Sequence, residues 1–198
     1  APVVAVDPNN QSPDCPAVIA ANHAGVVTAM EYLLELGHRR IGFIGGRPDL
    51  QSARQRFEGY QDALARAGLA QDPDLIVVGD FTPETGYECA RQLLLLDERP
   101  TAILAANDQS AFGAMAAARE MGLRIPEDLS IVGFDNIPEA AHCDPPLTTI
   151  DQFVDRMGIV AVEMVIDLIQ GQQLDSFLYT MPTELVIRDS CRALEAGA

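Results

Sequence analysis

The strongest constraint on the fold is a regular alternation of short apolar runs and segments of helical periodicity between residues 41 and 134. The apolar runs are IGFIGG, LIVVGD, TAILAAND and LSIVGFDN, and between them the apolar residues recur at helical spacing. Continuous apolar strands separated by helices are typical of a parallel sheet, because helices cover both faces of such a sheet. We therefore expect an α/β fold with the order β-α-β-α-β-α-β in this region.

Glycine and proline mark the expected helix ends. Three predicted helices are each followed by a glycine that stops them: Gly37, Gly68 and Gly122. Thr82 and Pro83 form a favourable helix start, because proline is well tolerated at the first helical position. A further helix is expected near 154–170, and the run TELVIR after it is expected to form a last strand.

Polar or aromatic side chains stand directly after the strands, at the edge where parallel α/β sheets bind their ligands. They are Arg54 and Arg56 after IGFIGG, Phe81 after LIVVGD, Asn107 and Asp108 after ILAA, and Asp135 and Asn136 after IVGF. A carboxylate accepts from neighbouring hydroxyls, a guanidinium donates several hydrogen bonds, and a carboxamide does both. With Phe81 to cover the apolar face of a ring, this combination predicts a site for a polyhydroxylated ligand.

Each of these residues also has a purely structural interpretation. Asp108 is suited to cap the helix that follows it, and Asn136 is suited to begin the turn before Pro138. Arg54 is suited to a solvated surface position. A single polar residue at a strand end more often serves the turn than a ligand. Polar groups at the ends of four strands on one sheet edge favour the binding site.

No pattern of catalytic or metal-binding residues can be given a role. GFIGGRP follows a strand but lacks both GxGxxG and the phosphate loop GxxxxGK[ST]. Three histidines are scattered without metal-ligand spacing: His23, His38 and His142. Ser190 and Cys191 have neither a nearby histidine nor a GxSxG elbow. We expect no metal, no cofactor and no enzymatic activity; a pairing of Asp108 with Asp135 is the arrangement an enzyme could use, and the capping interpretation weakens it.

The charge of the chain bears on its partners. Its formal net charge is −16 at pH 7, which repels phosphate backbones and anionic membranes, so these residues should not themselves bind DNA or a membrane. Four isolated cysteines form no CxxC pair and indicate a reducing compartment, for which we expect the cytoplasm: Cys15, Cys89, Cys143 and Cys191. No apolar run reaches the length of a transmembrane helix.

Several longer stretches resemble the lactose-repressor (LacI/GalR) family of bacterial transcription regulators. They are LLELGHRRIGFIGG, SARQRFEGYQDALARAGL, RPTAILAANDQSAFGAMAAAREMGLRIPEDLSIVGFDN, PPLTTIDQ and TELVIRDSC, and together they cover most of the chain. The resemblance implies a helix-turn-helix DNA-binding segment, a hinge, and a two-lobed domain like that of type I periplasmic sugar-binding proteins, with parallel sheets flanked by helices.

The resemblance also implies how the chain divides into lobes. Residues 1–36 and 151–181 would form part of the N-terminal lobe. Residues 37–150 and 182–198 would form a complete C-terminal lobe. The helix-turn-helix segment would lie outside this chain, so operator DNA would be bound only through that missing N-terminal domain.

Five residues match the ligand contacts of the family: Arg56, Phe81, Asn107, Asp135 and, more weakly, Gln152. Arg56 lies three residues before Gly59, as the family's effector-binding arginine does, and Phe81 matches its ring-stacking aromatic residue. Ala24 stands where some sugar-responsive members have an acidic residue, so one hydroxyl contact would be absent and the effector would differ.

The resemblance further implies a homodimer. It would form through the helix SAFGAMAAARE, especially Phe112 and Met115, and through the loop around Cys143; the alternative interpretation of Phe112 is a core residue. The expected function is the effector-sensing domain of a transcriptional repressor, binding a sugar or related polyol, with a nucleoside or purine as the second choice. A solute-binding receptor that feeds a transporter has the same fold and cleft and remains the alternative.

Overall fold

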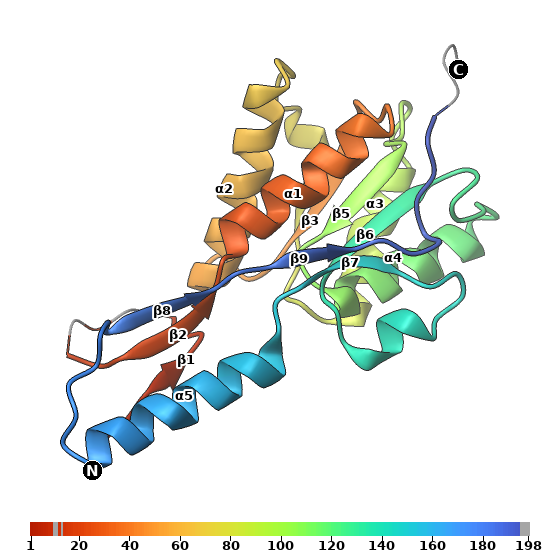
Figure 1. Ribbon diagram of the computed structural model, residues 1–198. Coiled ribbons are helices and arrows are strands. Elements are labelled where there is room, and N and C mark those ends of the chain that lie inside the picture. Colours follow the sequence, from red (N-terminus) through yellow and green to blue (C-terminus); the bar gives the residue numbers. More distant parts are fainter. Residues whose placement is uncertain (10–11, 13, 195–198) are drawn as a thin grey trace.

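The computed structural model describes residues 1–9, 12 and 14–194 and contains two sheets joined by three chain segments (Figure 1). The larger sheet has the strand order β4-β3-β5-β6-β7-β9 and the smaller one β1-β2-β8. The strands are β1 Ala5–Val6, β2 Ala17–Ala20, β3 Ile41–Gly45, β4 Ile76–Val78, β5 Ala102–Ala105, β6 Ser130–Asp135, β7 Thr148–Asp151, β8 Leu178–Met181 and β9 Glu184–Val186. The α-helices are α1 Asn22–Glu35, α2 Gln51–Arg66, α3 Pro83–Leu94, α4 Asp108–Glu120 and α5 Val154–Ile169.

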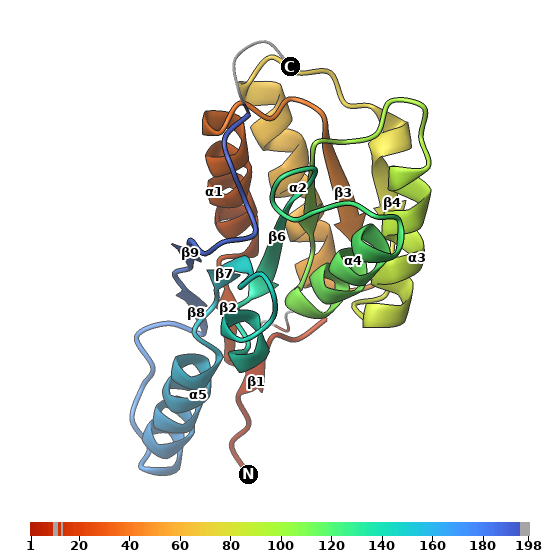
Figure 2. The same cartoon turned by 90° about the vertical axis from the view of Figure 1, so that its right-hand side faces the viewer.

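The larger lobe has the predicted parallel sheet with helices on both faces. Strands β3 to β7 pair in parallel, and β9 adds an antiparallel edge beside β7. Helices α1 and α2 pack on one face and α3 and α4 on the other (Figure 2). Each face has its own apolar core, and Ile103 and Leu104, neighbours on β5, are fully buried in opposite ones. The continuous apolar strands predicted this arrangement because both of their faces are covered.

Helix α1 corrects the predicted division of the chain at residue 36. Its apolar residues, among them Met30 and Leu33, are fully buried in the core formed with α2, so the helix belongs to the larger lobe. The boundary between the lobes therefore lies near Ala21, just before α1. The family resemblance suggested the later boundary. The apolar periodicity of the helix predicts a buried side but does not say which lobe covers it. The last four residues of the predicted C-terminal lobe, 195–198, lie outside the described residues.

The smaller lobe consists of the sheet β1-β2-β8 and helix α5, which lies along it (Figure 1). One side of α5 contributes Met157, Ala161 and Met164 to the core of this lobe. The opposite side is also apolar but exposed, with Ile159 and Val162 each more than half accessible. No helix among the described residues is long and apolar enough to cross a membrane.

Three crossings of the chain between the lobes place the candidate site. They run from β2 to α1, from β7 to α5 and from β8 to β9. The carboxyl ends of β3, β5, β6 and β7 point towards these crossings (Figure 1). Backbone strain gathers here too, because Phe81, Asp135 and Phe153 all have φ in the left-handed region, which side chains other than glycine rarely adopt.

Candidate functional site

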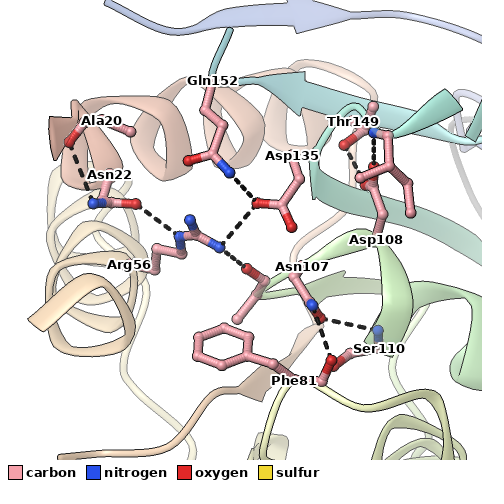
Figure 3. Close-up of polar contacts among 12 residues, drawn as sticks. Ala20, Asn22, Arg56, Phe81, Asn107, Asp108, Ser110, Asp135, Thr149 and Gln152 are labelled. Carbon is pink, nitrogen blue, oxygen red and sulfur yellow. Dashed lines mark hydrogen bonds and ion pairs between the residues drawn. The ribbon is translucent and has the colours of Figure 1, made fainter. Parts of the chain in front are cut away.

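The five predicted ligand-contact residues lie together between the lobes, as Figure 3 shows. Arg56 comes from α2, and each of the others stands at or just after the end of a strand in the larger sheet: Phe81, Asn107, Asp135 and Gln152. Hydrogen bonds join them in two groups: the side chain of Asp135 accepts from both Arg56 and Gln152, and the side chain of Asn107 donates to the carbonyl of Phe81. The convergence predicted from the strand ends is therefore present in the structure.

Arg56 is the centre of this cluster and is only 4% exposed. Its Nε donates to Oδ1 of Asn22 at 2.8 Å, and its Nη1 donates to the carbonyl of Ala106 at 2.5 Å and to Oδ1 of Asp135 at 3.4 Å. Burial lowers the pKa of the guanidinium, and the neighbouring charge of Asp135 opposes that shift. Among the described residues Nη2 has no acceptor, so its N–H groups are the donors of Arg56 that could serve a ligand; Figure 3 shows the bonds of Nε and Nη1.

Aromatic rings surround the guanidinium of Arg56. Its central carbon lies 3.8 Å from the ring centroid of Phe134 and 5.8 Å from that of Phe81. Such a cation over an aromatic face is stabilised by the quadrupole of the ring. Phe134 is fully buried and packs against the guanidinium of Arg56, whereas Phe81 is only partly buried.

Phe81 rests on Gly46. A Cβ atom at Gly46 would overlap the ring of Phe81, so only glycine fits there. Gly46, the third glycine of GFIGGRP, thus makes room for the aromatic ring. Phe81 itself has a φ of 74°, an unfavourable value for a bulky residue. The exposed side of the ring is suited to stack against a ring-shaped ligand.

Asp135 combines a strained backbone with a partly buried carboxylate. Its φ is 118° and its side chain is 19% exposed. Oδ1 accepts from Nε2 of Gln152 at 2.7 Å and, more distantly, from Arg56. Burial raises the pKa of Asp135 to about 6, although Arg56 lowers it. The carboxylate is therefore mostly ionised at neutral pH, and Oδ2 remains available to accept from ligand hydroxyls.

Two adjacent polar residues follow each of β5 and β6, and the two residues of each pair have different roles. After β6, Asp135 pairs with Arg56 and Gln152, whereas Asn136 donates to Asp151 at 2.9 Å and accepts from Arg188 at 2.6 Å. Asn136 therefore links the end of β6 to β7 and to the segment after β9, a structural role that the turn interpretation anticipated only in part.

The pair after β5 corrects the predicted helix cap. Asn107, not Asp108, caps α4, because its Oδ1 accepts from the backbone N–H of Ser110 at 2.9 Å. Asp108 is the first residue of the helix and is fully buried, where it accepts from the hydroxyl of Thr149 and from the N–H of Ile137. Asp108 therefore does not face the cleft and cannot form an acid–base pair there with Asp135.

Two residues of the site were missed by the sequence analysis. Asn22, the first residue of α1, orients Arg56 through its Oδ1 and is 2% exposed. Asp7 follows β1 in the smaller lobe, and its charge raises the pKa values of both Arg56 and Asp135. Asn22 reaches Arg56 because α1 packs on α2 within the larger lobe. Asp7 comes near Arg56 only through the placement of the smaller lobe against the larger one, which no local sequence pattern indicates.

Of the three residues predicted for a dimer interface, two lie together on the surface. Phe112 and Cys143 are half-buried and line a surface hollow of about 480 Å³ together with His142 and Pro138. Met115 is 2% exposed and belongs to the core between α4 and the sheet, so its side chain cannot contact a partner. The prediction for Met115 was therefore wrong, because its side chain packs into the core on the inner side of α4.

The part of the chain that the structure describes contains no group of three or more His, Cys, Asp or Glu side chains able to hold a metal ion. His38 is instead buried, with its ring nitrogens at 2.9 Å from the Thr101 hydroxyl and 3.1 Å from that of Ser130. Burial lowers the pKa of His38. Its polar partners hold the β3, β5 and β6 ends together, which is a structural role.

Comparison with known proteins identifies similar chains over nearly this whole length. The family described as periplasmic binding protein-like domain matches residues 30–191. The HTH-type transcriptional repressor CytR of Escherichia coli (strain K12) is 44% identical over 181 residues, covering 91% of this chain and 53% of that protein. The chain thus spans about half the length of this curated relative.

Two solved structures extend the comparison to three dimensions. A regulatory protein of the LacI family from Chloroflexus aggregans is 36% identical with a TM-score of 0.89, covering 96% of this chain and 68% of that one. The transcriptional regulator CelR in complex with cellobiose is 32% identical with a TM-score of 0.86, covering 94% of this chain and 58% of that one.

Proposed function

Because this chain belongs to the LacI family of transcriptional regulators, a family with the periplasmic binding protein-like fold, we propose that it is the effector-sensing part of a repressor. Its cleft binds a small, ring-shaped compound with several hydroxyl groups, and a sugar is the first choice. The observation that carries the proposal is the cluster of Arg56, Asp135 and Phe81, which offers a donor, an acceptor and an aromatic face to one ligand.

The residues across the cleft support a ligand-driven movement of the lobes. Arg56, Asp135 and Gln152 are attached to the larger lobe, whereas Asp7 belongs to the smaller one. A ligand that contacts both sides binds the closed arrangement more tightly than the open one and therefore shifts the population towards it. In the whole protein that shift would change how a DNA-binding segment meets its operator, which couples the two binding events.

Two chemical sources of the effector share the same groups. A free sugar presents hydroxyls to Asp135 and a C–H face to Phe81, and the CelR structure was solved with cellobiose. A nucleoside presents the hydroxyls of its ribose and, in addition, a flat base that stacks well on an aromatic ring. The acidic surface of the chain, with a net charge of −16, favours neutral compounds of either kind over phosphorylated ones.

The remaining parts of the proposal concern partners and place. The regulator acts as a homodimer in the cytoplasm, and the hollow with Phe112 and Cys143 is its contact surface within this chain. Operator DNA is bound by a segment outside these residues. The matches to regulators of transcription favour this function over a solute receptor of a transporter.

The proposal is tested by a ligand panel on the full-length protein. D-ribose, cellobiose, cytidine and adenosine are added separately, and the melting temperature is followed by scanning fluorimetry. A ligand that binds only the folded protein raises the melting temperature with concentration. At least one of the four compounds should raise the melting temperature. The same compound should weaken or strengthen the binding of the protein to its operator in a gel shift. A protein that binds operator but responds to none of the four compounds would contradict the proposed ligand class.

Replacing Asp135 by asparagine should weaken effector binding about ten- to a hundredfold, through loss of a hydrogen bond to a charged acceptor. The amide keeps the shape but replaces one acceptor oxygen with a donor. Because Asp135 also pairs with Arg56, the unliganded protein should lose some stability as well. Isothermal titration with D-ribose and cytidine measures the affinity, and Asp62→Asn, an exposed carboxylate on α2, is the control. Equal affinity in the Asp135 and Asp62 variants would remove Asp135 from the site.

The 198-residue chain by itself should not bind duplex DNA at physiological salt. Binding to DNA depends on positive side chains that displace counterions from the phosphates. This chain has 29 acidic and 13 basic residues, so its net field opposes DNA. A gel-shift titration of the chain with operator fragments measures the outcome. Specific binding by these residues alone would contradict the proposal that effector and operator DNA are bound by different segments of the protein.

A further inference from the structure

The aromatic ring of Phe81 needs support that its own backbone does not provide. A φ of 74° is unfavourable for a residue with a bulky side chain. The ring is only partly buried, so packing on Gly46 alone does not fix its orientation. Neighbouring groups must therefore hold the Phe81 backbone in place if the ring is to present a constant face to the cleft.

Two sets of hydrogen bonds hold this turn. On one side, Nδ2 of Asn107 donates to the carbonyl oxygen of Phe81 at 3.0 Å. On the other, the carboxylate of Asp80 accepts from the N–H of Thr82 at 3.0 Å and from the hydroxyls of Thr82 and Thr85. The second set lies on the exposed surface, whereas the bond from Asn107 reaches the turn from the protein interior, next to the cleft.

Both polar atoms of the Asn107 side chain make hydrogen bonds within the protein. Its Oδ1 caps α4 by accepting from Ser110, and its Nδ2 holds Phe81. Only 7% of the residue is exposed. The carboxamide thus joins the start of α4 to a loop 26 residues earlier in the chain (Figure 3). Figure 3 shows no bond from Asn107 to Arg56 or Asp135, the groups that face the ligand space.

We propose that Asn107 is a positioning residue, which acts on effector binding through Phe81 and not through its own contact with the effector. It holds the carbonyl of Phe81 and thereby keeps the aromatic ring against Gly46, where the ring forms one wall of the cleft. This inference rests on the proposed function, because it assigns Phe81 the wall of an effector site. It changes the role of Asn107 from ligand contact to support of the ring.

Asn107→Asp separates the two bonds of the side chain. Aspartate caps helices as well as asparagine does, and a negative charge is favourable at a helix N-terminus, so α4 keeps its cap. A carboxylate cannot donate to the carbonyl of Phe81, and the bond that holds the ring is lost. Gln92→Glu makes the same change from amide to carboxylate at an exposed position of the neighbouring helix α3, away from Phe81 and from the proposed dimer surface, and it is the matched control.

The first measurement is a double-mutant cycle with D-ribose and cytidine, using isothermal titration of the full-length protein. In the wild-type background Asn107→Asp should lower affinity about tenfold, as expected for one lost hydrogen bond at a functional position. In a Phe81→Ala background the same change should alter affinity by less than about twofold, because its only route to the ligand has been removed. An equal loss in both backgrounds would mean that Asn107 contacts the effector itself, and no loss in either would mean that Phe81 is held without it.

The second measurement does not depend on any ligand. The chain contains no tryptophan, so Phe81→Trp introduces a single indole into these residues at the position of the ring. Acrylamide should quench this indole more strongly when Asn107→Asp is added, and Gln92→Glu should leave the quenching unchanged. Equal quenching in all three proteins would overturn the proposal. If neither D-ribose nor cytidine binds the wild-type protein, the proposed ligand class fails, and this measurement still decides the role of Asn107.

Discussion

Replacing Arg56 by alanine is expected to lower effector affinity by at least about a hundredfold, which corresponds to the loss of two charged hydrogen bonds of roughly 1.5 kcal/mol each. The reason is the position of the guanidinium: it is 4% exposed and pairs with Asp135, and Nη2 has no acceptor among the described residues, so we expect it to donate to the ligand. The change also removes the positive charge beside Asp135 and leaves this partly buried carboxylate with only the neutral donor Gln152 among the partners described above. That carboxylate would then bind a proton more readily and accept ligand hydroxyls less well.

The same substitution should cost some stability, because Arg56 also holds Asn22 and the carbonyl of Ala106 and packs on Phe134. We expect about 1–3 kcal/mol, the usual cost of leaving buried polar groups unsatisfied. The Arg56→Ala protein should still unfold cooperatively, which circular dichroism checks before isothermal titration with D-ribose and cytidine.

Arg54→Ala provides the matched control for Arg56→Ala. Arg54 lies two residues earlier on the same helix but is exposed, and its guanidinium donates to the carbonyls of Pro48 and Asp49. Its removal should leave affinity unchanged within the error of the titration. A folded Arg56→Ala protein with the affinity of the Arg54→Ala protein would remove Arg56 from the effector site.

Protein stability is expected to fall as pH rises from about 4 to about 7, because Asp108 is buried. Burial raises the pKa of Asp108 from 3.8 to about 7, and the bonds from Thr149 and Ile137 offset only part of that shift. The native protein therefore binds a proton at Asp108 more tightly than the unfolded chain does. The resulting stabilisation is complete below the unfolded pKa and is lost as pH rises through the folded one. A shift of this size corresponds to a few kcal/mol, at about 1.4 kcal/mol per pKa unit.

Asp108→Asn should abolish this contribution. The amide keeps the shape, its oxygen can accept from the N–H of Ile137, and its nitrogen can donate to the hydroxyl of Thr149. Urea unfolding between pH 5 and pH 8 should show a smaller fall in stability for the variant than for the wild type. The quantity to compare is the difference between the two proteins, because the lowered pKa of buried His38 has the opposite sign and is common to both.

The control for Asp108→Asn is Asp128→Asn. The pKa of Asp128 is lowered to about 2, chiefly by hydrogen bonds from Arg124, so this carboxylate gives a stability that is lost only as pH falls towards 2. Its replacement should leave the pH dependence between pH 5 and pH 8 unchanged. If Asp108→Asn also leaves that dependence unchanged, the buried carboxylate is not the source of the slope.

The larger lobe could be predicted well from the sequence, because its signals are local and agree with one another. The apolar strands around Ile103 and Ile131 are buried on both sides, and Thr82 caps α3 with Pro83 at its first position, as predicted. The smaller lobe was harder to predict. Helix α1 satisfies its apolar stripe against α2, and periodicity alone does not say which lobe provides the partner.

The sequence predicted which residues form the site but not which hydrogen bonds connect them. The strand-end argument brought Arg56, Phe81 and Asp135 to one edge, and the resemblance added Gln152. The structure places Arg56 and Gln152 in contact with Asp135. The roles of adjacent polar residues could not be separated, because neighbouring side chains at a strand end point in different directions. The cap of α4 was therefore given to Asp108 instead of Asn107.

The most direct test of the central claim is a crystal structure of the full-length protein with the compound of the panel that raises the melting temperature most. The account predicts that compound in the cleft between the lobes, with its ring against Phe81, a hydroxyl on Oδ2 of Asp135 and an acceptor on Nη2 of Arg56. A compound bound in the hollow lined by Phe112 and Cys143, or held in the cleft without Arg56 and Asp135, would contradict it.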